Sequence, residues 1–136
     1  MNEMNQSQLL LKNIKAAFRG IIEAPANATP QKIRELSAQQ FQSIFKDLKV
    51  QIKGSEHLPY EQGSIFIYNH LNNHPSLMAA DNFQITLDSH YISSLIYKYY
   101  KDPGLRVARY SLPNESNHKA YYDRFDYVRV YSKNFT

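Results

Sequence analysis

The chain has 136 residues, of which 43% are hydrophobic and 13% aromatic, and its formal net charge is +4. This length suits one domain of modest size, and the apolar content can supply a buried core, which argues against wholesale disorder. The chain contains no cysteine, which excludes disulfides, thiol nucleophiles and cysteine-based zinc sites. No apolar run approaches the length of a membrane span or of a signal peptide's apolar segment.

The first predicted element is an amphipathic helix over residues 6–23. Its apolar residues recur at helical spacing, which is the pattern of a helix with one buried face: Leu10, Leu11, Ile14, Ala17, Phe18, Ile21 and Ile22. One interpretation is a helix on a membrane surface, with basic residues at the lipid headgroups. The other is packing onto the protein's own core, which we favour on general grounds.

A second helix follows a linker over residues 24–30. Thr29 is a suitable N-cap, and Pro30 suits the first helical turn, where a missing backbone N–H costs nothing. The apolar spacing extends this helix to about Leu48. Together the two helices predict a helical segment over residues 1–47.

From residue 48 the pattern becomes one of strands alternating with helices. Strands are predicted at 50–53, ending at Gly54, and at 64–68, a compact apolar run of the kind buried on both faces of a sheet. Residues 71–83 read as a loop with at most one helical turn. The remaining expected elements are a helix over 89–100 capped by Ser89 or Asp88, a strand over 105–110, a short helix within 111–126 and a strand over 127–131. This order predicts an α/β domain over 48–136, with a mixed sheet and connecting helices.

The pair Asn69-His70 stands where the predicted strand 64–68 ends, and α/β proteins tend to bind ligands at the carboxyl ends of strands. A histidine there can remove a proton from an alcohol, because its ordinary pKa lies near working pH. A carboxylate on its second ring nitrogen would fix the tautomer and stabilise the imidazolium. The predicted site is therefore a general base that needs an acidic partner.

The string Gln51-Ile-Lys-Gly-Ser-Glu-His-Leu-Pro59, followed by Gly63-Ser-Ile-Phe-Ile-Tyr-Asn-His70, resembles the opening of lysophosphatidate and glycerol-phosphate acyltransferases. In that family a strand, a glycine, a turn with Leu-Pro and a second strand lead to Asn-His. An aspartate follows the histidine after four residues. The resemblance implies that His70 deprotonates a glycerol hydroxyl, which attacks the thioester of an acyl-CoA or acyl carrier protein.

The spacing after His70 departs from the family, because Pro75 stands where the aspartate is expected. Leu87-Asp88 before an apolar helix resembles what surrounds that aspartate, so an insertion within 71–85 would make Asp88 the partner of His70. Asn69 would shape the turn that presents the histidine and, with Arg106 and Arg109, is expected to contact the substrate. Leu105-Arg-Val-Ala-Arg109 resembles the family's next strand with its basic residues. Arg106 and Arg109 lie three apart and hence on opposite faces of a strand, so we expect one of them to meet a phosphate.

The resemblance thus implies an acyltransferase of phospholipid biosynthesis that acts on a glycerol-phosphate or lysophospholipid acceptor, with the acyl thioester as co-substrate and no bound cofactor or metal. We expect a cytoplasmic protein, peripheral at the inner face of the membrane. The family's Glu-Gly phosphate motif is absent from the sequence. We therefore expect an incomplete acyltransferase domain, with low or absent acyl transfer by these residues alone.

Other interpretations remain open at this point. His118 and Asp123 have the family's literal spacing, but they follow a polar stretch rather than a buried strand, and short motifs match by chance. A metal site of His70, His74 and His90 with Asp88 is a further alternative, although no tight ligand spacing supports it. A nucleic-acid-binding module is disfavoured because basic and aromatic residues do not cluster on one element. A noncatalytic lipid- or protein-binding domain is the main alternative function.

Overall fold

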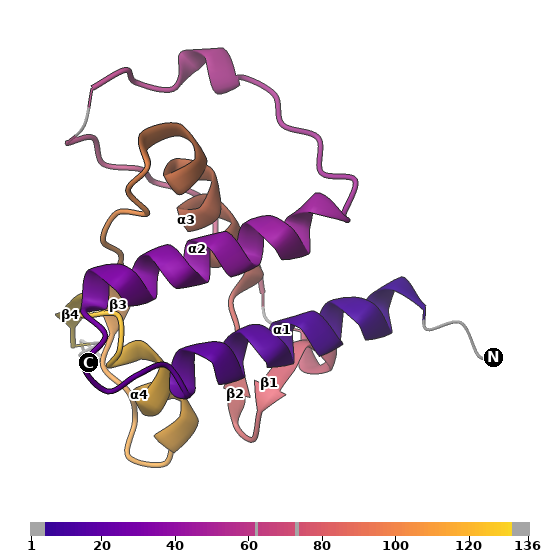
Figure 1. Ribbon diagram of the computed structural model, residues 1–136, viewed down its shortest axis with the longest axis vertical. Coiled ribbons are helices and arrows are strands. Elements are labelled where there is room, and N and C mark those ends of the chain that lie inside the picture. Colours follow the sequence, from indigo (N-terminus) through magenta and orange to yellow (C-terminus); the bar gives the residue numbers. More distant parts are fainter. Residues whose placement is uncertain (1–4, 62, 73, 132–136) are drawn as a thin grey trace, which may run out of the picture.

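The computed structural model describes residues 5–61, 63–72 and 74–131 and shows a mixed α/β fold (Figure 1). The N-terminal elements are the helices α1 (Gln6–Ile22) and α2 (Pro30–Lys46), followed by the short 3-10 turns η1 (Ser55–His57) and η2 (Pro75–Leu77). The rest of the described chain holds, in order, β1 (Met78–Ala80), β2 (Phe83–Gln84), α3 (Leu87–Tyr100), β3 (Val107–Arg109), α4 (Ser116–Tyr122) and β4 (Val128–Val130).

The two predicted N-terminal helices are confirmed, and local capping explains where they begin. At α1 the side chain of Asn5 accepts from the backbone N–H of Gln8, whose own side chain accepts from the backbone N–H of Asn5. At α2 the hydroxyl of Thr29 accepts from the N–H of Lys32 at 3.3 Å, as its position before Pro30 predicted. Each cap satisfies backbone donors that the first helical turn leaves unpaired.

The apolar face of α1 is part of the core. Ile14 and Ile21 have no exposed surface, and Phe18 stacks on Tyr121 of α4 with ring centroids 5.7 Å apart. The core cluster joins both N-terminal helices to the later elements through Ile33, Phe41, Ile44, Ala79, Phe83, Ile85, Tyr122, Phe125 and Tyr127. Since the protein's own core already covers this face, the interpretation that α1 packs onto the core is confirmed. The other interpretation, that this face lies on a membrane surface, is wrong. Across the described ranges, no helix has the length and apolar content that crossing a bilayer requires.

Helix α3 packs against α2 and is confirmed, but its predicted cap is wrong. The helix begins at Leu87, and the N-cap position is Thr86, without a side-chain capping bond. Neither Asp88 nor Ser89 caps it, because both lie inside the first turn and make other contacts. The Ser89 hydroxyl accepts from the Tyr68 hydroxyl at 3.1 Å, and the Asp88 carboxylate contacts His70.

In place of the single mixed sheet that the sequence predicted, the described residues form two separate two-stranded sheets. Strands β3 and β4 pair in parallel, with Val107 opposite Val128 and Arg109 opposite Val130, which confirms the last two predicted strands at shorter length. Strands β1 and β2 form an antiparallel hairpin. Strand β1 lies within the stretch 71–83, which the sequence predicted to be a loop, and β2 begins at its last residue. The short helix predicted within 111–126 is α4.

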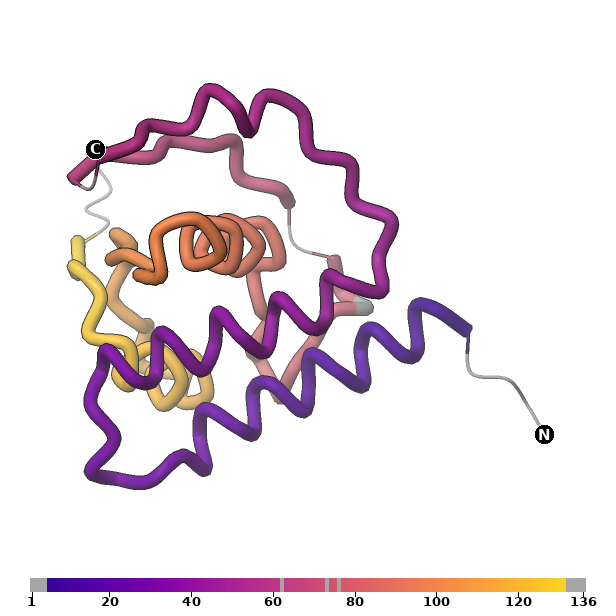
Figure 2. Tube along the Cα trace, turned by 45° about the horizontal axis from the view of Figure 1, so that its top comes forward, coloured from indigo at the N-terminus to yellow at the C-terminus, as the bar shows by residue number. Residues whose placement is uncertain are grey.

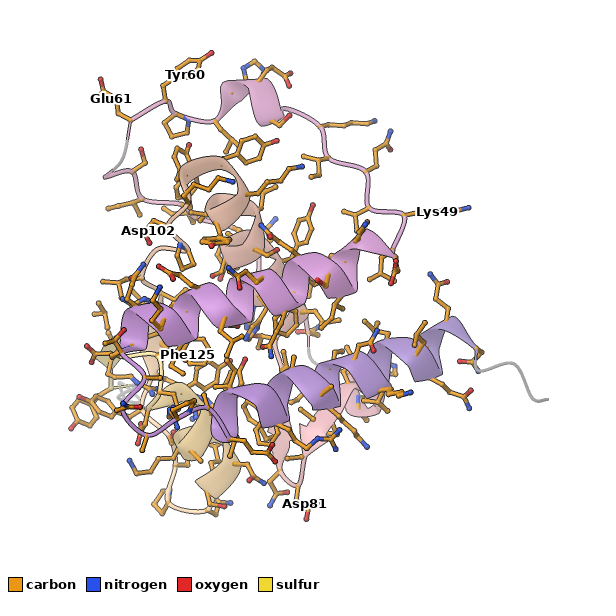
Figure 3. All side chains as sticks on the ribbon, viewed as in Figure 1. Lys49, Tyr60, Glu61, Asp81, Asp102 and Phe125 are labelled. Carbon is orange, nitrogen blue, oxygen red and sulfur yellow. The ribbon has the colours of Figure 1, made fainter. Side chains whose placement is uncertain are left out.

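The predicted strands at 50–53 and 64–68 are wrong. Both stretches lie outside any strand, and Ile65 and Ile67 are 90% and 93% exposed. They belong to a long arc of chain that passes around α3 in both views (Figure 1, Figure 2), and Tyr60 and Glu61 project from it (Figure 3). A strand is stabilised by the backbone of a neighbour, and in the described chain β3 pairs with β4 rather than with 64–68. Apolar content alone could not supply that partner.

Candidate functional site

The structure brings His70 and Asp88 together, although 18 positions separate them in the chain. The Nδ1 atom of His70 contacts the Oδ2 atom of Asp88. His70 lies in the segment that directly follows the arc around α3, and Asp88 lies in the first turn of α3. The side chain of His70 is 59% exposed, whereas that of Asp88 is only 9% exposed. The carboxylate is therefore held inside the protein and the imidazole faces outward from it.

The Asp88 carboxylate is also held by the backbone. Its Oδ2 atom accepts from the N–H of Leu71 at 2.9 Å. Burial opposes the charged form of Asp88, but the hydrogen bonds from Leu71 and His70 outweigh it, so the pKa of Asp88 lies below its usual value. With an ionised Asp88 on Nδ1, the other ring nitrogen of His70, Nε2, is the one available to a ligand.

His70 lines a cavity of about 740 Å³, which we call the histidine cavity because His118 lines it as well. Its walls come from the β1–β2 hairpin, the start of α3, the stretch around β3 and helix α4. Phe83, Tyr122 and Tyr127 supply aromatic wall, while Arg106, Arg109 and Glu115 supply charge. This volume is in the range of small-molecule sites.

A second hollow of about 690 Å³ adjoins the first, and we call it the isoleucine groove after Ile65, Ile67, Ile92 and Ile96. It lies between the arc at 63–68, one face of α3 and residues 102–107. Tyr68, Arg106 and Val107 line both hollows. A ligand with a polar head and an apolar tail therefore finds one place for each part, with Tyr68 and Arg106 at the junction.

Arg106 occupies that junction in a half-buried position. Its Nη2 atom donates to the Tyr127 hydroxyl at 2.5 Å, and its guanidinium lies 4.6 Å from the centre of the Tyr127 ring. The Nε atom is buried without a hydrogen-bond partner. Among the described residues no carboxylate forms an ion pair with Arg106, although six other such pairs occur.

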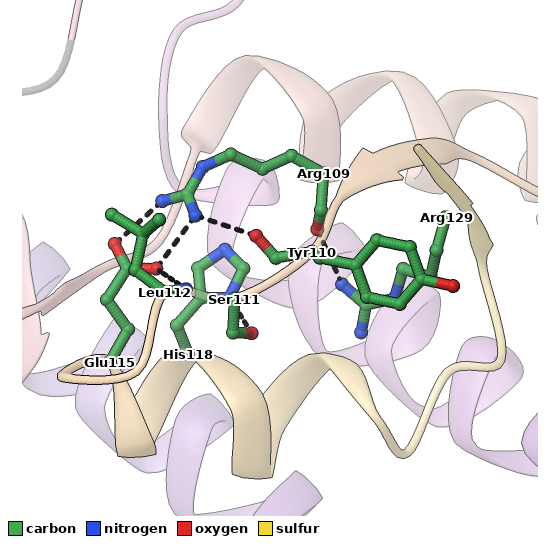
Figure 4. A network of polar contacts seen from close by, with 7 residues as sticks. All are labelled: Arg109, Tyr110, Ser111, Leu112, Glu115, His118 and Arg129. Carbon is green, nitrogen blue, oxygen red and sulfur yellow. Dashed lines mark hydrogen bonds and ion pairs between the residues drawn. The ribbon is translucent and has the colours of Figure 1, made fainter. Parts of the chain in front are cut away.

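Arg109 also lines the histidine cavity, so the expectation that only one of the two arginines faces the site is wrong. Arg109 is the last residue of β3, and its long side chain reaches the cavity from there. This side chain is 41% exposed. Both of its terminal nitrogens donate to Glu115, at 2.7 Å each (Figure 4). These bonds lower the pKa of Glu115 to about 2. Unlike Arg106, Arg109 already has an anionic partner.

Asn69 is exposed and does not line the histidine cavity. It does not line the isoleucine groove either, so it lies outside both hollows.

The literal motif of His118 and Asp123 does not form a pair. His118 shares a hydrogen bond of 2.6 Å with the Ser111 hydroxyl through Nδ1 (Figure 4). Asp123 instead pairs with Lys119 and, at 3.3 Å, with Arg129. His118 lies within α4 and Asp123 is the C-cap of that helix, and the offset of five residues turns the two side chains to different neighbours. His118 nonetheless lines the histidine cavity, and burial, followed by the charge of Arg109, lowers its pKa.

Sequence reasoning missed two residues of the site, Tyr68 and Glu115. Tyr68 is the last residue of an apolar run, and nothing in that pattern predicts that it lines both the histidine cavity and the isoleucine groove. Glu115 stands six residues after Arg109, and no local pattern predicts an ion pair across a loop of that length.

The metal alternative finds no support in the part of the chain that the structure describes, where no group of three or more histidine, cysteine or acidic residues is placed to hold an ion. His90 in particular is 1% exposed inside the core.

Comparison of the chain with protein-family models, with curated proteins and with solved structures finds no match.

Proposed function

We propose that the chain belongs to an acyltransferase that moves a fatty acyl group from a CoA or acyl-carrier-protein thioester to a hydroxyl of a glycerol-phosphate-type acceptor. The observation that carries the proposal is the contact of His70 with Asp88, whose side chain is 9% exposed, at the edge of the histidine cavity. The resemblance of the Asn69-His70 segment to glycerolipid acyltransferases supplies the reaction class.

In this proposal Asp88 holds the Nδ1–H of His70, and Nε2 takes the proton of the acceptor hydroxyl. The hydroxyl oxygen attacks the thioester carbonyl carbon, the carbon–sulfur bond breaks, and the proton on Nε2 passes to the leaving sulfur, which departs as the thiol. A carboxylate that fixes the tautomer and stabilises the imidazolium is the arrangement on which histidine bases depend.

The two hollows supply places for the two ends of such a substrate. The isoleucine groove offers apolar side chains to the acyl chain, which gains about 0.8 kcal/mol for each CH₂ group removed from water. Arg106, with no carboxylate partner in the described chain, is the better placed of the two arginines to meet an anionic group, because Arg109 is bound to Glu115. Acceptors of this class belong to lipid metabolism, so the proposal places the protein in the cytoplasm, peripheral at the inner face of the membrane.

The test is acyl transfer by the natural gene product that contains this chain, measured with a labelled acyl-CoA and a panel of glycerol-phosphate and lysophospholipid acceptors. His70→Ala should lower kcat by about a hundredfold to ten-thousandfold, the usual range for loss of a general base. His57→Ala is the matched control, because the His57 side chain is 82% exposed on a turn.

Unchanged transfer in His70→Ala would overturn the proposal. Binding of acyl-CoA without any transfer by the unaltered gene product would also overturn it, and would favour a noncatalytic lipid-binding domain.

A further inference from the structure

The charges around the histidine cavity are unevenly paired. Two arginines line it, and the one glutamate in its wall, Glu115, is bound to Arg109 through both carboxylate oxygens. Arg106 has no such partner in the described part of the chain. The cavity therefore offers a ligand one cation that no carboxylate neutralises.

Glu115 is fixed where it lies. Besides the two bonds from Arg109, its Oε2 atom accepts from the backbone N–H of Leu112 at 2.8 Å, and only 18% of its side chain is exposed. In Figure 4 the Arg109 guanidinium and the Glu115 carboxylate face each other beside His118. A ligand that claimed Arg109 would have to break this arrangement or lie beside a like charge.

The surroundings of Arg106 favour a small anion. Its Nε–H is buried and unpaired, which is costly unless a ligand accepts that bond. The Tyr127 ring and hydroxyl hold the guanidinium at the junction of the two hollows.

We propose that the histidine cavity selects an acceptor that carries one negative charge, a phosphodiester or a carboxylate, on Arg106, and that Glu115 discriminates against phosphate monoesters by occupying Arg109. This inference rests on the proposed function in taking the histidine cavity as the acceptor site, and it narrows the acceptors of that proposal. Glycerol phosphate and lysophosphatidate are phosphate monoesters and would be rejected, whereas a lysophospholipid whose phosphate is esterified twice would be accepted. Charge discrimination of this kind depends on a repulsive group as much as on an attractive one.

The test is the binding of small probes to the full chain by NMR titration at about pH 8, where a phosphate monoester is doubly charged because its second pKa lies near 6. Dimethyl phosphate and methyl phosphate differ in this charge. Dimethyl phosphate or acetate should bind at least about tenfold more tightly than methyl phosphate, a difference of about 1.4 kcal/mol. Preference for dimethyl phosphate over acetate would identify the phosphodiester, and the reverse the carboxylate.

Variants assign the selectivity to residues. Glu115→Gln keeps an acceptor for Leu112 but removes the charge, so methyl phosphate should bind within about threefold of dimethyl phosphate. Arg106→Leu should abolish monoanion binding. Glu23→Gln, an exposed position at the end of α1, is the matched control and should bind as the unaltered chain does, and thermal melts check that each variant folds.

Equal or tighter binding of methyl phosphate by the unaltered chain would overturn the inference. So would selectivity that survives in Glu115→Gln, or no binding of any probe. The assay detects no acyl transfer, so a protein that selects the monoanion but transfers no acyl group would count against the proposed function alone.

Discussion

The Nε2 atom of His90 lies 2.9 Å from the hydroxyl oxygen of Tyr121, which joins α3 to α4 inside the core. The Nδ1 atom of the same ring lies 2.8 Å from the Thr86 carbonyl oxygen. Because a carbonyl only accepts, Nδ1 carries the proton, Nε2 is the acceptor, and Tyr121 donates. Both side chains are at most 1% exposed, so neither has water as a substitute partner.

Removal of the Tyr121 hydroxyl should destabilise the fold. Tyr121→Phe leaves Nε2 of His90 with only the 3.4 Å contact from Arg106, and an under-satisfied buried acceptor costs about 1 to 3 kcal/mol. Urea unfolding monitored by circular dichroism measures the change. Tyr60→Phe, at a side chain 97% exposed, is the control. A Tyr121→Phe variant as stable as the control would show that the hydroxyl contributes nothing.

The same histidine should make the protein less stable in mild acid. Burial, and secondly the charge of Arg106, lower the pKa of His90 well below its ordinary value, so the unfolded chain binds a proton there that the folded chain does not. The contribution is fully present above the unfolded pKa, about 6.5, and is lost as pH falls below it, by at most about 1.4 kcal/mol per pH unit.

Urea unfolding at a series of pH values between about 7 and 5 measures how the free energy of unfolding depends on pH. This range spans the pKa of an unfolded histidine, about 6.5. His90→Gln should flatten the dependence relative to the unaltered chain. An equally steep loss of stability in the variant would assign the effect to other groups.

Truncation of two isoleucines should change the stability of the protein by very different amounts. Ile33 is 1% exposed in α2 and Ile65 is 90% exposed on the arc around α3. Ile33→Ala should cost about 2 to 5 kcal/mol through lost burial and a cavity, whereas Ile65→Ala should stay within about 0.5 kcal/mol. Both follow from denaturant unfolding. A loss above about 1 kcal/mol at Ile65 would mean that residues 64–68 pack against the protein in solution.

Asp88 should matter for turnover more than for binding. In the natural gene product, the Asp88→Asn amide would donate to Nδ1 of His70 rather than accept from it. The ring proton then sits on Nε2, which can no longer take a proton from the acceptor hydroxyl. We expect kcat to fall by about a hundredfold or more, with little change in KM. Asp81→Asn, on the exposed tip of the β1–β2 hairpin (Figure 3), is the control. Equal effects on kcat and KM in both variants would contradict the role of Asp88.

The sequence by itself determined the helices. Helix starts depend on residues only a few positions apart, as at Thr29, Pro30 and Lys32, and the buried faces follow from the spacing of apolar residues such as Ile14 and Ile21. The candidate residues His70 and Asp88 were also predictable, because the Asn-His and Leu-Asp segments each resemble part of a known pattern. Their roles in catalysis stay predictions.

Only the tertiary structure decided the strands and the charges of the site. A strand needs a neighbour from elsewhere in the chain. The apolar run at 64–68 therefore has the pattern of a buried strand, yet it lies largely exposed as one wall of the isoleucine groove. Alternation placed Arg106 and Arg109 on opposite faces, yet long side chains bring both to one cavity, where Glu115 binds the second and leaves the first without a carboxylate. Such pairings depend on how distant segments fold together, and no local pattern records them.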